Sequence, residues 1–577
     1  MRDRPLIIAA RGGKSIVFVL AGVAVLCLSA RGARSQAGDR FDVLIRHGRV
    51  VDGTGAPWQQ IDVGVRGDRI AALGRLDAAS ADREIDATGL VVSPGFIDLL
   101  GQSEFFLLVD NRAASKIYQG VTSEITGEGS SIAPLNGVMT EAARPLYEHY
   151  HLAVDFRTLG EYFDRLSARA HPAINLGSFI GAGSVRDFVI GKDDRPATPQ
   201  ELERMQALVS EAMAQGALGL STSLQYVPDR FASTDELVAL ATAAARAGGV
   251  YFTHQRSESG QIDRSLEEVA AIAERAHIPA EIWHLKTAYR ANWGRMPAVL
   301  RFLEQARARG LDITANMYPY TRASNGLDAC LPIWVREGGV DKMLARLADP
   351  AVRERVRNEM ADEHATGWEN QWFGSGGGDG VMVASVLNPD LRQYEGMTLT
   401  AIAKKMDKDP RDAVMDLVVA DRGQTACILA IMDEADVRAA LAHPLIAIGT
   451  DSEGRAEDGP LAGTSSHPRG WGSFPRFLGH YVRDEHLVSL EEAVRRVTSR
   501  PAVRVGLTDR GVLKAGLAAD ITIFDPATIR DLATFESPNH YSVGVRHVFV
   551  NGRPVLSDGH MSDERPGRVL RGPGYRP

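Results

Sequence analysis

Four short apolar runs in the middle of the chain are each followed by a side chain that can bind a metal ion or transfer a proton: Glu128, His254, His284 and Asp451. Imidazole nitrogens and carboxylate oxygens are the ligands of catalytic zinc sites, which keep one coordination position open for water. Zinc lowers the pKa of that water to about 7, and a further carboxylate can carry its proton to a leaving group. Each residue alone also fits a structural role, such as a turn for Asp451. Their shared position at strand ends favours a hydrolytic metal centre.

Short apolar strands alternate with helical stretches through the middle of the chain, a pattern that indicates a parallel sheet. Strands are expected at 121–126, 174–180, 217–221, 250–254, 280–284, 313–318 and 445–451, and helices at 199–215 and 265–276. A closed (β/α)8 barrel fits the length of this region better than an open sheet. In such a barrel the carboxyl ends of the strands share one face, so the four side chains would meet there.

The two ends of the body have a different pattern, with alternating apolar and polar residues at 41–46, 61–65, 519–524 and 545–552. This alternation predicts short strands. We expect a small β-sandwich assembled from residues 38–94 and 506–577, flanking a barrel at 95–505. A more charged, helix-rich segment at about 338–430 is interpreted as an insertion in the barrel that covers the mouth of the site, with a flexible loop over the glycine-rich residues 368–380.

The chain has 577 residues, of which 44% are hydrophobic and 24% charged, as in ordinary globular proteins. This composition excludes a disordered chain, a collagen-like rod and a multi-span membrane protein. The net charge of −8 argues against a nucleic-acid partner, which needs a basic surface. One of the three cysteines lies in the leader, so no disulfide framework is expected. Nothing in the sequence indicates an oligomeric state.

Residues 1–37 have the pattern of a cleaved signal peptide, with basic residues before an apolar run at 15–30 and the small residues Ser35 and Ala37 near its end. A membrane anchor is the alternative, but the apolar run is short for a span. We therefore expect no stable membrane span after processing, and a periplasmic or secreted location.

The chain resembles the amidohydrolase superfamily and, within it, the D-aminoacylase (N-acyl-D-amino-acid deacylase) family. The likeness runs from Phe41 to about Gly572, and it is carried by the stretches at 93–98, 119–122, 219–222, 253–256, 284–286, 318–321, 467–469, 474–476 and 516–520. These stretches are specific as a set, although each alone is weak. The resemblance implies a (β/α)8 barrel with a small β-sandwich, and zinc-dependent hydrolysis of an N-acyl amide.

The resemblance also implies roles for individual residues. His254 and His284 match the zinc histidines, and Asp451 matches the catalytic aspartate. Four residues match those that hold the substrate carboxylate and amide: Lys286, Tyr318, Ser324 and Arg469. Cationic side chains suit a carboxylate, and arginine can bind it through two parallel hydrogen bonds, although a structural ion pair is the alternative for each cation. Tyr226 would line the side-chain pocket. In the expected reaction, His467 would assist the metal in polarising the acyl carbonyl.

Two departures from the family pattern change the expected metal site. The His-x-His pair of the family is replaced here by Leu100 and Gln102. The Gly-Asn-Cys-Gly signature reads Gly-Glu-Gly-Ser at 127–130. Alignment from the downstream side puts Glu128 on the zinc-binding cysteine, and alignment from the upstream side puts it on the asparagine. We prefer the first, because it exchanges one anionic ligand for another.

The sequence therefore predicts a single divalent ion, most consistent with Zn2+, held by Glu128, His254 and His284. A carboxylate is a harder ligand than the thiolate found in the family, so manganese binding becomes less unfavourable here than in the family. The second metal position should be empty, with partial replacement by Glu104 as the alternative.

We expect a metal-dependent hydrolase that cleaves N-acyl amino acids, with the D-series favoured, by attack of a metal-bound water whose proton passes through Asp451. The alternatives are a dipeptidase, a cyclic-amide hydrolase or a lactonase on the same site, or a non-catalytic binding protein.

Overall fold

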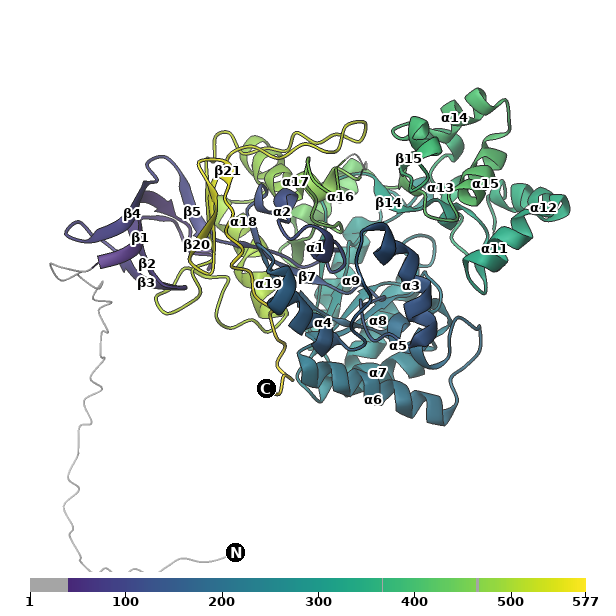
Figure 1. Cartoon of the computed structure of the whole chain (residues 1–577), viewed down its shortest axis with the longest axis horizontal. Coiled ribbons are helices and arrows are strands. Elements are labelled where there is room, and N and C mark those ends of the chain that lie inside the picture. The colour runs from purple at the N-terminus through teal and green to yellow at the C-terminus, as the bar shows by residue number, and fades with distance from the viewer. Residues whose placement is uncertain (1–39, 366, 463–465) are drawn as a thin grey trace, which may run out of the picture.

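The computed structural model describes residues 40–365, 367–462 and 466–577, so the predicted leader at 1–37 lies outside the described residues. A nine-stranded sheet from both ends of the chain forms one side of the molecule (Figure 1). Its strands are β1 (Arg40–Val50), β2 (Gln59–Arg66), β3 (Arg69–Gly74), β4 (Ser80–Asp86), β5 (Val91–Pro94), β18 (Ile521–Phe524), β19 (Val545–Val550), β20 (Arg553–Ser557) and β21 (His560–Met561). The antiparallel pairing of β5 with β18 joins the two halves, and an apolar cluster that includes Val63 and Ile521 forms its core.

Parallel strands form the (β/α)8 barrel beside this sheet: β6 (Phe96–Asp98), β7 (Val121–Thr126), β8 (Asn175–Ser178), β9 (Ile180–Gly181), β10 (Gly219–Ser223), β11 (Val250–His254), β12 (Ala280–Ile282), β13 (Ile313–Met317) and β17 (Ile446–Ile448). β6, β7 and β8 pair with one another, and β9 to β13 pair in order with β17 at the end. A single residue, Phe179, separates β8 from β9, so these two count as one of the eight barrel strands. A parallel bridge between Gly101 and Ser452 links the first and last strands.

Helices surround the barrel, among them α6 (Pro199–Gln215), α7 (Thr234–Ala245) and α8 (Ile262–Ala276) (Figure 1). The bounds of α6 follow from local chemistry. Thr198 and Glu201 form a capping box at its start, and Gly216 ends it in the left-handed conformation. The other barrel helices are α1 (Phe106–Val109), α2 (Ala114–Ile117), α3 (Gly137–His149), α4 (Leu159–Arg165), α5 (Ala182–Val189), α9 (Met296–Ala308), α16 (Glu434–Ala442), α17 (Arg469–Arg476), α18 (Leu490–Val497) and α19 (Ser499–Arg504).

Between β13 and β17 the chain builds a separate group of elements, which lies to the right in Figure 1. It contains a small antiparallel sheet of β14 (Ala323–Gly326), β16 (Ala426–Leu429) and β15 (Val381–Ser385), which the sequence analysis did not anticipate. Its helices are α10 (Ile333–Arg336), α11 (Val340–Leu347), α12 (Pro350–Met360), α13 (Gln371–Gly374), α14 (Leu399–Met406) and α15 (Pro410–Ala420).

The flexible loop expected at 368–380 was a wrong prediction. Helix α13 and a 3-10 turn at Gly377–Asp379 occupy most of this stretch. The side chain of Asn370 caps α13 by accepting a hydrogen bond from the backbone of Phe373, and the carboxylate of Glu369 accepts one from the Ser259 hydroxyl. Side-chain contacts therefore order a segment whose glycine content alone indicates mobility.

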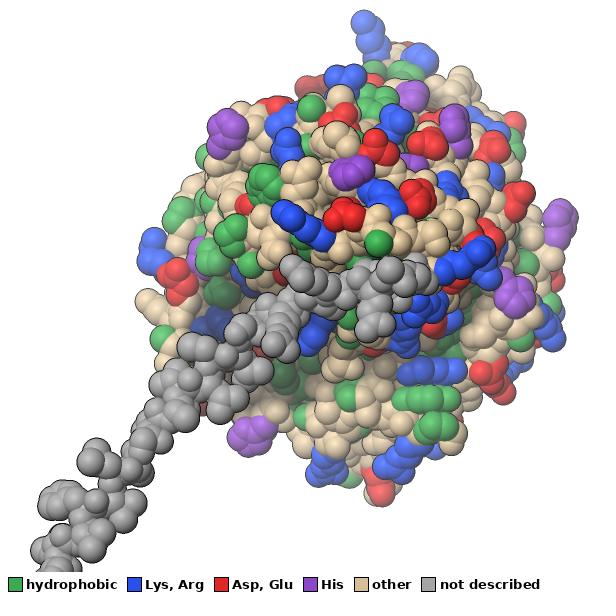
Figure 2. All heavy atoms as spheres, turned by 90° about the vertical axis from the view of Figure 1, so that its left-hand side faces the viewer, with side chains coloured by type: hydrophobic (Ala, Val, Ile, Leu, Met, Phe, Trp, Pro, Cys, Tyr) green, Lys and Arg blue, Asp and Glu red, His purple; other side chains and the backbone are tan. Residues whose placement is uncertain are grey.

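Within the described residues no helix has the length and apolar character needed to cross a membrane. Figure 2 shows the face formed by the nine-stranded sheet, where acidic and basic side chains are interspersed over the visible part of the surface.

A buried charge cluster lies where the first and last barrel strands meet. The Lys116 ammonium, on α2, donates hydrogen bonds to the carboxylate of Asp98 at 2.7 Å and to the Thr450 hydroxyl at 2.6 Å. It also reaches the carbonyl oxygen of Ser452 at 2.7 Å and the carboxylate of Glu124 at 3.6 Å. The Lys116 side chain has no exposed surface, so its charge depends on these partners. Lys116 thus fixes both residues that flank Asp451.

We predict that Lys116→Met lowers the free energy of unfolding by about 3–5 kcal/mol, because it leaves buried carboxylates without their cation. Denaturant unfolding of the full chain measures this change. The matched control is Lys514→Met, at an exposed lysine, which should change stability by less than about 0.5 kcal/mol. Equal effects of the two substitutions would contradict the assigned role of Lys116.

Candidate metal centre

Three donor atoms converge at the carboxyl end of the barrel strands, one from the last residue of β11 and two from the loops after β7 and β12. One oxygen of Glu128, Oε1, lies 3.2 Å from Nδ1 of His254 and 2.9 Å from Nε2 of His284. These two nitrogens are 2.9 Å apart. Among the described residues this is the one group of three or more histidine, cysteine or acidic side chains whose donor atoms could hold a metal ion.

Backbone conformation brings these groups into the barrel mouth. Gly127 and Gly129 flank Glu128 with φ angles of 94° and 63°, which glycine adopts without the steric cost that a Cβ would impose. His284 and Asp451 also have positive φ, 35° and 49°, which costs a residue with a side chain of the order of 1–3 kcal/mol. Such backbone strain persists where surrounding structure enforces it, and it gathers at functional sites.

A second carboxylate, Glu258, supports the triad from behind. Its Oε1 lies 3.0 Å from Nδ1 of His284, and its Oε2 lies 4.0 Å from Nε2 of His254. A carboxylate on the far nitrogen orients a ligating histidine and increases its basicity. The sequence analysis missed Glu258. Its position four residues after His254, in the loop that follows β11, was the signal available.

The electrostatics of this group favour a bound cation. Burial by itself would raise the pKa of Glu128, but the adjacent His284 and His254 hold it well below its ordinary value. Burial and Lys286 lower the pKa of His284, yet Glu128 and Glu258 outweigh them and raise it to about 9. Two buried carboxylates thus require positive charge between them. A nitrogen–nitrogen–oxygen donor set in this arrangement fits a divalent ion such as zinc.

The residues at the missing His-x-His positions fill the space differently. Leu100 is buried in an apolar cluster with Ile97 and Ala447. The amide of Gln102 donates a hydrogen bond to Oε2 of Glu128 at 2.7 Å and lies 3.5 Å from Oδ1 of Asp451. Glu104 is not part of the triad, and burial raises its pKa to about 8. A neutral, buried carboxyl of this kind is a poor replacement for a lost metal ligand.

Asp451 lies beside the triad and is paired with Arg469. Its Oδ2 is 2.7 Å from a terminal nitrogen of the Arg469 guanidinium. Burial raises the pKa of Asp451, while Arg469 opposes this shift. Gln102 bridges Asp451 to Glu128, so the candidate acid-base residue and the candidate metal ligands form one connected group.

A cavity of about 370 Å³ opens over the triad. The five residues predicted to hold the substrate line it: Tyr226, Lys286, Tyr318, Ser324 and Arg469. The Arg469 guanidinium lies over the Tyr318 ring, 4.7 Å from its centroid. In the described part of the chain, Nε of Arg469 and the Tyr318 hydroxyl are buried without a hydrogen-bond partner. Buried polar atoms without partners are costly, so these two groups are available for a polar ligand.

The second predicted cation, Lys286, already has a partner. Its ammonium lies 2.6 Å from Oε1 of Glu258 and 2.7 Å from Nδ1 of His284. Lys286 therefore belongs to the support of the triad as well as to the cavity wall. A ligand that contacts Lys286 would share its ammonium group with Glu258.

The structure does not support the expected role of His467 in polarising a carbonyl. Its Nε2 lies 3.0 Å from the backbone oxygen of Arg322, and its Nδ1 accepts a hydrogen bond from the backbone of Arg469. Burial and the charge of Arg469 hold the pKa of His467 well below its ordinary value. With both nitrogens engaged by the backbone, a neutral His467 fixes the loop that carries Arg469.

Two further polar residues of the cavity were missed in the sequence. Asn325, on β14, donates a hydrogen bond to the Tyr226 hydroxyl at 3.0 Å, and its amide lies 3.2 Å from Oε1 of Gln371. The Tyr226 ring in turn meets the His254 ring edge-on, with centroids 5.1 Å apart. The segment between β13 and β17 thus forms one wall of the cavity, through Asn325, Gln371 and Leu429.

Comparison with known proteins shows relatives along almost the whole described chain. Residues 406–556 match the model of the Amidohydrolase family. A D-aminoacylase of Alcaligenes xylosoxydans xylosoxydans is 36% identical over 532 residues, covering 92% of this chain and 97% of the relative. An N-acyl-D-glutamate deacylase of the same organism is 34% identical, with coverage of 92% and 97%. The crystal structure of the Bordetella bronchiseptica N-acyl-D-glutamate deacylase with zinc and a phosphonate mimic of the tetrahedral intermediate has a TM-score of 0.75 at 31% identity, covering 92% of this chain and 100% of that one.

Loss of a residue that only hydrogen-bonds a metal ligand weakens metal binding roughly 10–100-fold. We predict that Glu128→Gln weakens zinc binding by more than this, because it removes the charge of a ligand itself. Glu128→Cys, which supplies a thiolate, should retain zinc. Competition with a chelator and elemental analysis of the purified protein measure both variants. The control is Glu203→Gln, at an exposed glutamate of α6. Unchanged zinc affinity in Glu128→Gln would remove Glu128 from the site.

Proposed function

The chain belongs to the D-aminoacylase family of amidohydrolases, and from this premise we propose that it is a metal-dependent hydrolase that cleaves the amide bond of N-acyl-D-amino acids. The observation that carries the proposal is the convergence of Glu128, His254 and His284 next to the Asp451–Arg469 pair in one cavity. This arrangement places donors for a metal ion, an acid-base group and a cation for a carboxylate around the same space.

The proposed metal centre holds one divalent ion, most consistent with Zn2+, between Glu128, His254 and His284. Bound there, the ion would supply Lewis acidity and lower the pKa of water. The apolar packing of Leu100 and the hydrogen bond from Gln102 to Glu128 support a single ion. These two residues occupy the positions of the His-x-His pair that a second ion would require.

Asp451 is the proposed proton carrier. It accepts a proton when the amide carbonyl is attacked and returns it to the departing amine nitrogen, so that the leaving group departs neutral. Arg469 pairs with the Asp451 carboxylate and holds it in place, and Lys116 fixes the adjacent Thr450 and Ser452. Burial of the cavity walls excludes water and strengthens the electrostatic interactions within the site.

The amino-acid half of the substrate is proposed to lie against Arg469 and Tyr318. The free Nε of Arg469 and the free Tyr318 hydroxyl can both donate to a carboxylate, and the nearby Lys286 adds positive charge. Ser324, from β14, would contact the amide, and Tyr226 would border the side chain of the substrate.

The leader pattern at 1–37 supports a further part of the proposal, namely export to the periplasm or beyond. The substrates proposed for this enzyme are then small extracellular N-acyl amino acids.

A substrate panel tests the proposed function. The purified zinc-loaded chain is incubated with matched N-acetyl-D- and N-acetyl-L-amino acids, a dipeptide series, a cyclic amide and a lactone, and the released amine or acid is measured. We expect hydrolysis of the D-series well above the L-series. Dominant turnover of a dipeptide, cyclic amide or lactone would replace the substrate class, and a lack of turnover in every arm would favour a binding protein.

We predict that Asp451→Asn lowers kcat by about 10²–10⁴-fold, because the amide cannot carry the proton. Zinc content should stay that of the wild type, since Asp451 is not one of the three donors. Steady-state kinetics on the best substrate of the panel and elemental analysis provide the two readouts. Asp390→Asn, at an exposed aspartate of the segment between β13 and β17, is the control. Near-normal turnover by Asp451→Asn would refute the proton-carrier role.

A further inference from the structure

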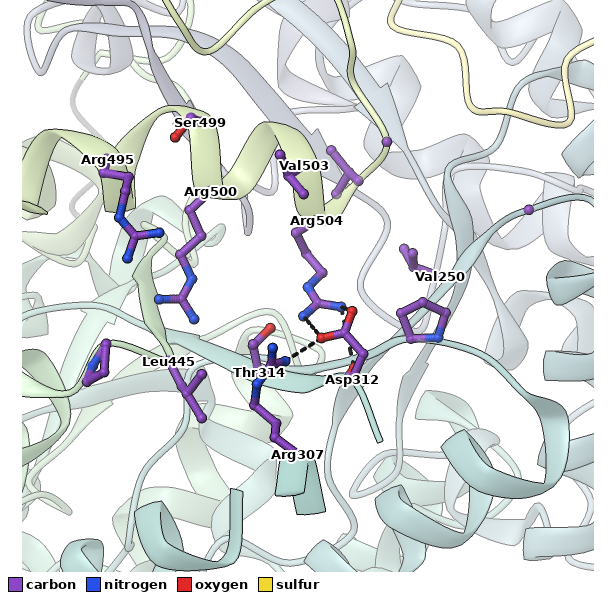
Figure 3. A pocket seen from close by; sticks show the side chains of 15 residues that line it. Val250, Arg307, Asp312, Thr314, Leu445, Arg495, Ser499, Arg500, Val503 and Arg504 are labelled. Carbon is purple, nitrogen blue, oxygen red and sulfur yellow. Dashed lines mark hydrogen bonds and ion pairs between the residues drawn. The ribbon is translucent and has the colours of Figure 1, made fainter. Parts of the chain in front are cut away.

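A second cavity, of about 600 Å³, lies at the amino ends of the barrel strands, opposite the metal centre. Figure 3 shows the side chains that line it. Residues at or just before the amino ends of β11, β12, β13 and β17 form its floor: Val250, Pro279, Asp312, Thr314 and Leu445. Helices α18 and α19 cover it and contribute Arg495, Arg500 and Arg504. The residues that line it are all different from those of the cavity over the metal centre.

Most of the arginines around this cavity are held by carboxylates. Arg504 pairs with Asp312 at 3.0 Å and with Glu281 at 3.3 Å, and Arg307 also pairs with Asp312. A single carboxylate, that of Glu492, serves both Arg495 and Arg496, at 2.7 Å and 2.8 Å. Four arginines thus share three carboxylates in this group.

Arg500 is the exception. Its guanidinium projects into the cavity between Arg495 and Arg504, and no dashed line reaches it in Figure 3. Among the described residues it has no hydrogen bond or ion pair. Burial lowers its pKa, Glu281 raises it, and the neighbouring Arg496, Arg495 and Arg504 lower it, so that together they bring it to about 10. Five arginines, including Arg500, thus stand near three carboxylates, which leaves an excess of two positive charges around the cavity.

The two hydroxyl groups that line the cavity form their hydrogen bonds with groups other than Arg500. The Thr314 hydroxyl is donated to Glu281, and the Ser499 hydroxyl is donated to the carbonyl oxygen of Gly53 at 2.6 Å. Apolar side chains complete the cavity, and one of them, Val503, is 78% exposed. The cavity therefore combines the Arg500 guanidinium, which has no partner among the described residues, with an apolar wall.

We propose that this cavity binds a small oxyanion, a carboxylate or a phosphate, through the guanidinium groups of Arg500 and Arg495. A guanidinium binds either oxyanion through parallel charge-assisted hydrogen bonds, which are stronger than those between neutral groups. The anion neutralises the excess charge. The apolar wall, with Val503, Leu445 and Pro279, gives room for a hydrocarbon chain and favours a carboxylate that carries one. The site is separate from the metal centre, so the proposal does not depend on the proposed function.

Isothermal titration of the full zinc-loaded chain tests this site with three probes: inorganic phosphate, acetate and octanoate. We expect saturable binding, with octanoate tighter than acetate because its chain covers apolar surface. Tighter binding of phosphate than of both carboxylates would assign the anion as phosphate and leave the site in place. A lack of binding of all three up to about 10 mM would overturn the proposal.

Three variants distinguish anion binding at this cavity from anion binding at the metal centre, which also contains cationic side chains. Arg500→Gln should weaken binding by about tenfold or more, since it removes one charged hydrogen-bonding partner. Arg500→Lys should retain part of the affinity, and Arg204→Gln, at an exposed arginine of α6, should retain all of it.

Thermal unfolding without added anion establishes that each variant is folded. If Arg500→Gln does not fold, Val503→Asp places an opposing charge at an exposed position of the cavity rim and should weaken binding in the same way. Wild-type affinity in either folded variant would overturn the site and assign the observed heat to the metal centre.

Discussion

The organisation of the site depends on one buried carboxylate oxygen, Oε1 of Glu128, which faces two imidazole nitrogens at about hydrogen-bond distance. The partners are 126 and 156 residues away in sequence, so only the barrel brings them together. A buried acid next to a second acid, Glu258, is costly unless positive charge lies between them. Strained backbone at His284 and Asp451, the hydrogen bond from Gln102 and the ammonium of Lys286 all maintain this arrangement. The donor set and the charge of this group fit a bound cation.

The departures from the family pattern form a coherent set. The segment that would carry a histidine pair instead packs Leu100 into the apolar core and points the Gln102 amide at Glu128. An amide donor fits a carboxylate ligand because it can hydrogen-bond the second oxygen, whereas a thiolate has no second acceptor atom. Loss of the pair and gain of the carboxylate therefore belong together.

Much of this could be predicted from the sequence because barrel chemistry follows strand ends. The apolar runs that end at His254 and Asp451 correspond to β11 and to the residues after β17. Helix α6 was predictable to the residue, since its capping box and terminal glycine are local signals. Glu258 offered only its spacing from His254 as a signal and Lys116 offered none, because both roles arise from contacts with residues far along the chain or across a loop. For the same reason the ordered glycine-rich stretch and the backbone-bound His467 were interpreted wrongly.

The arginine-lined cavity and the candidate metal centre lie at opposite ends of the barrel, and strand β12 leads from one to the other. Glu281, on this strand, pairs with Arg504 at the amino end, while His284, three residues further on, faces Glu128 at the carboxyl end. A shared strand does not by itself transmit a signal, because coupling needs an element with two alternative arrangements. Nothing about β12 requires two arrangements, since its three residues are buried and paired on both sides. An anion bound at Arg500 would thus add stability at the amino end of the barrel in proportion to its affinity, and it would leave the geometry of the metal centre unchanged.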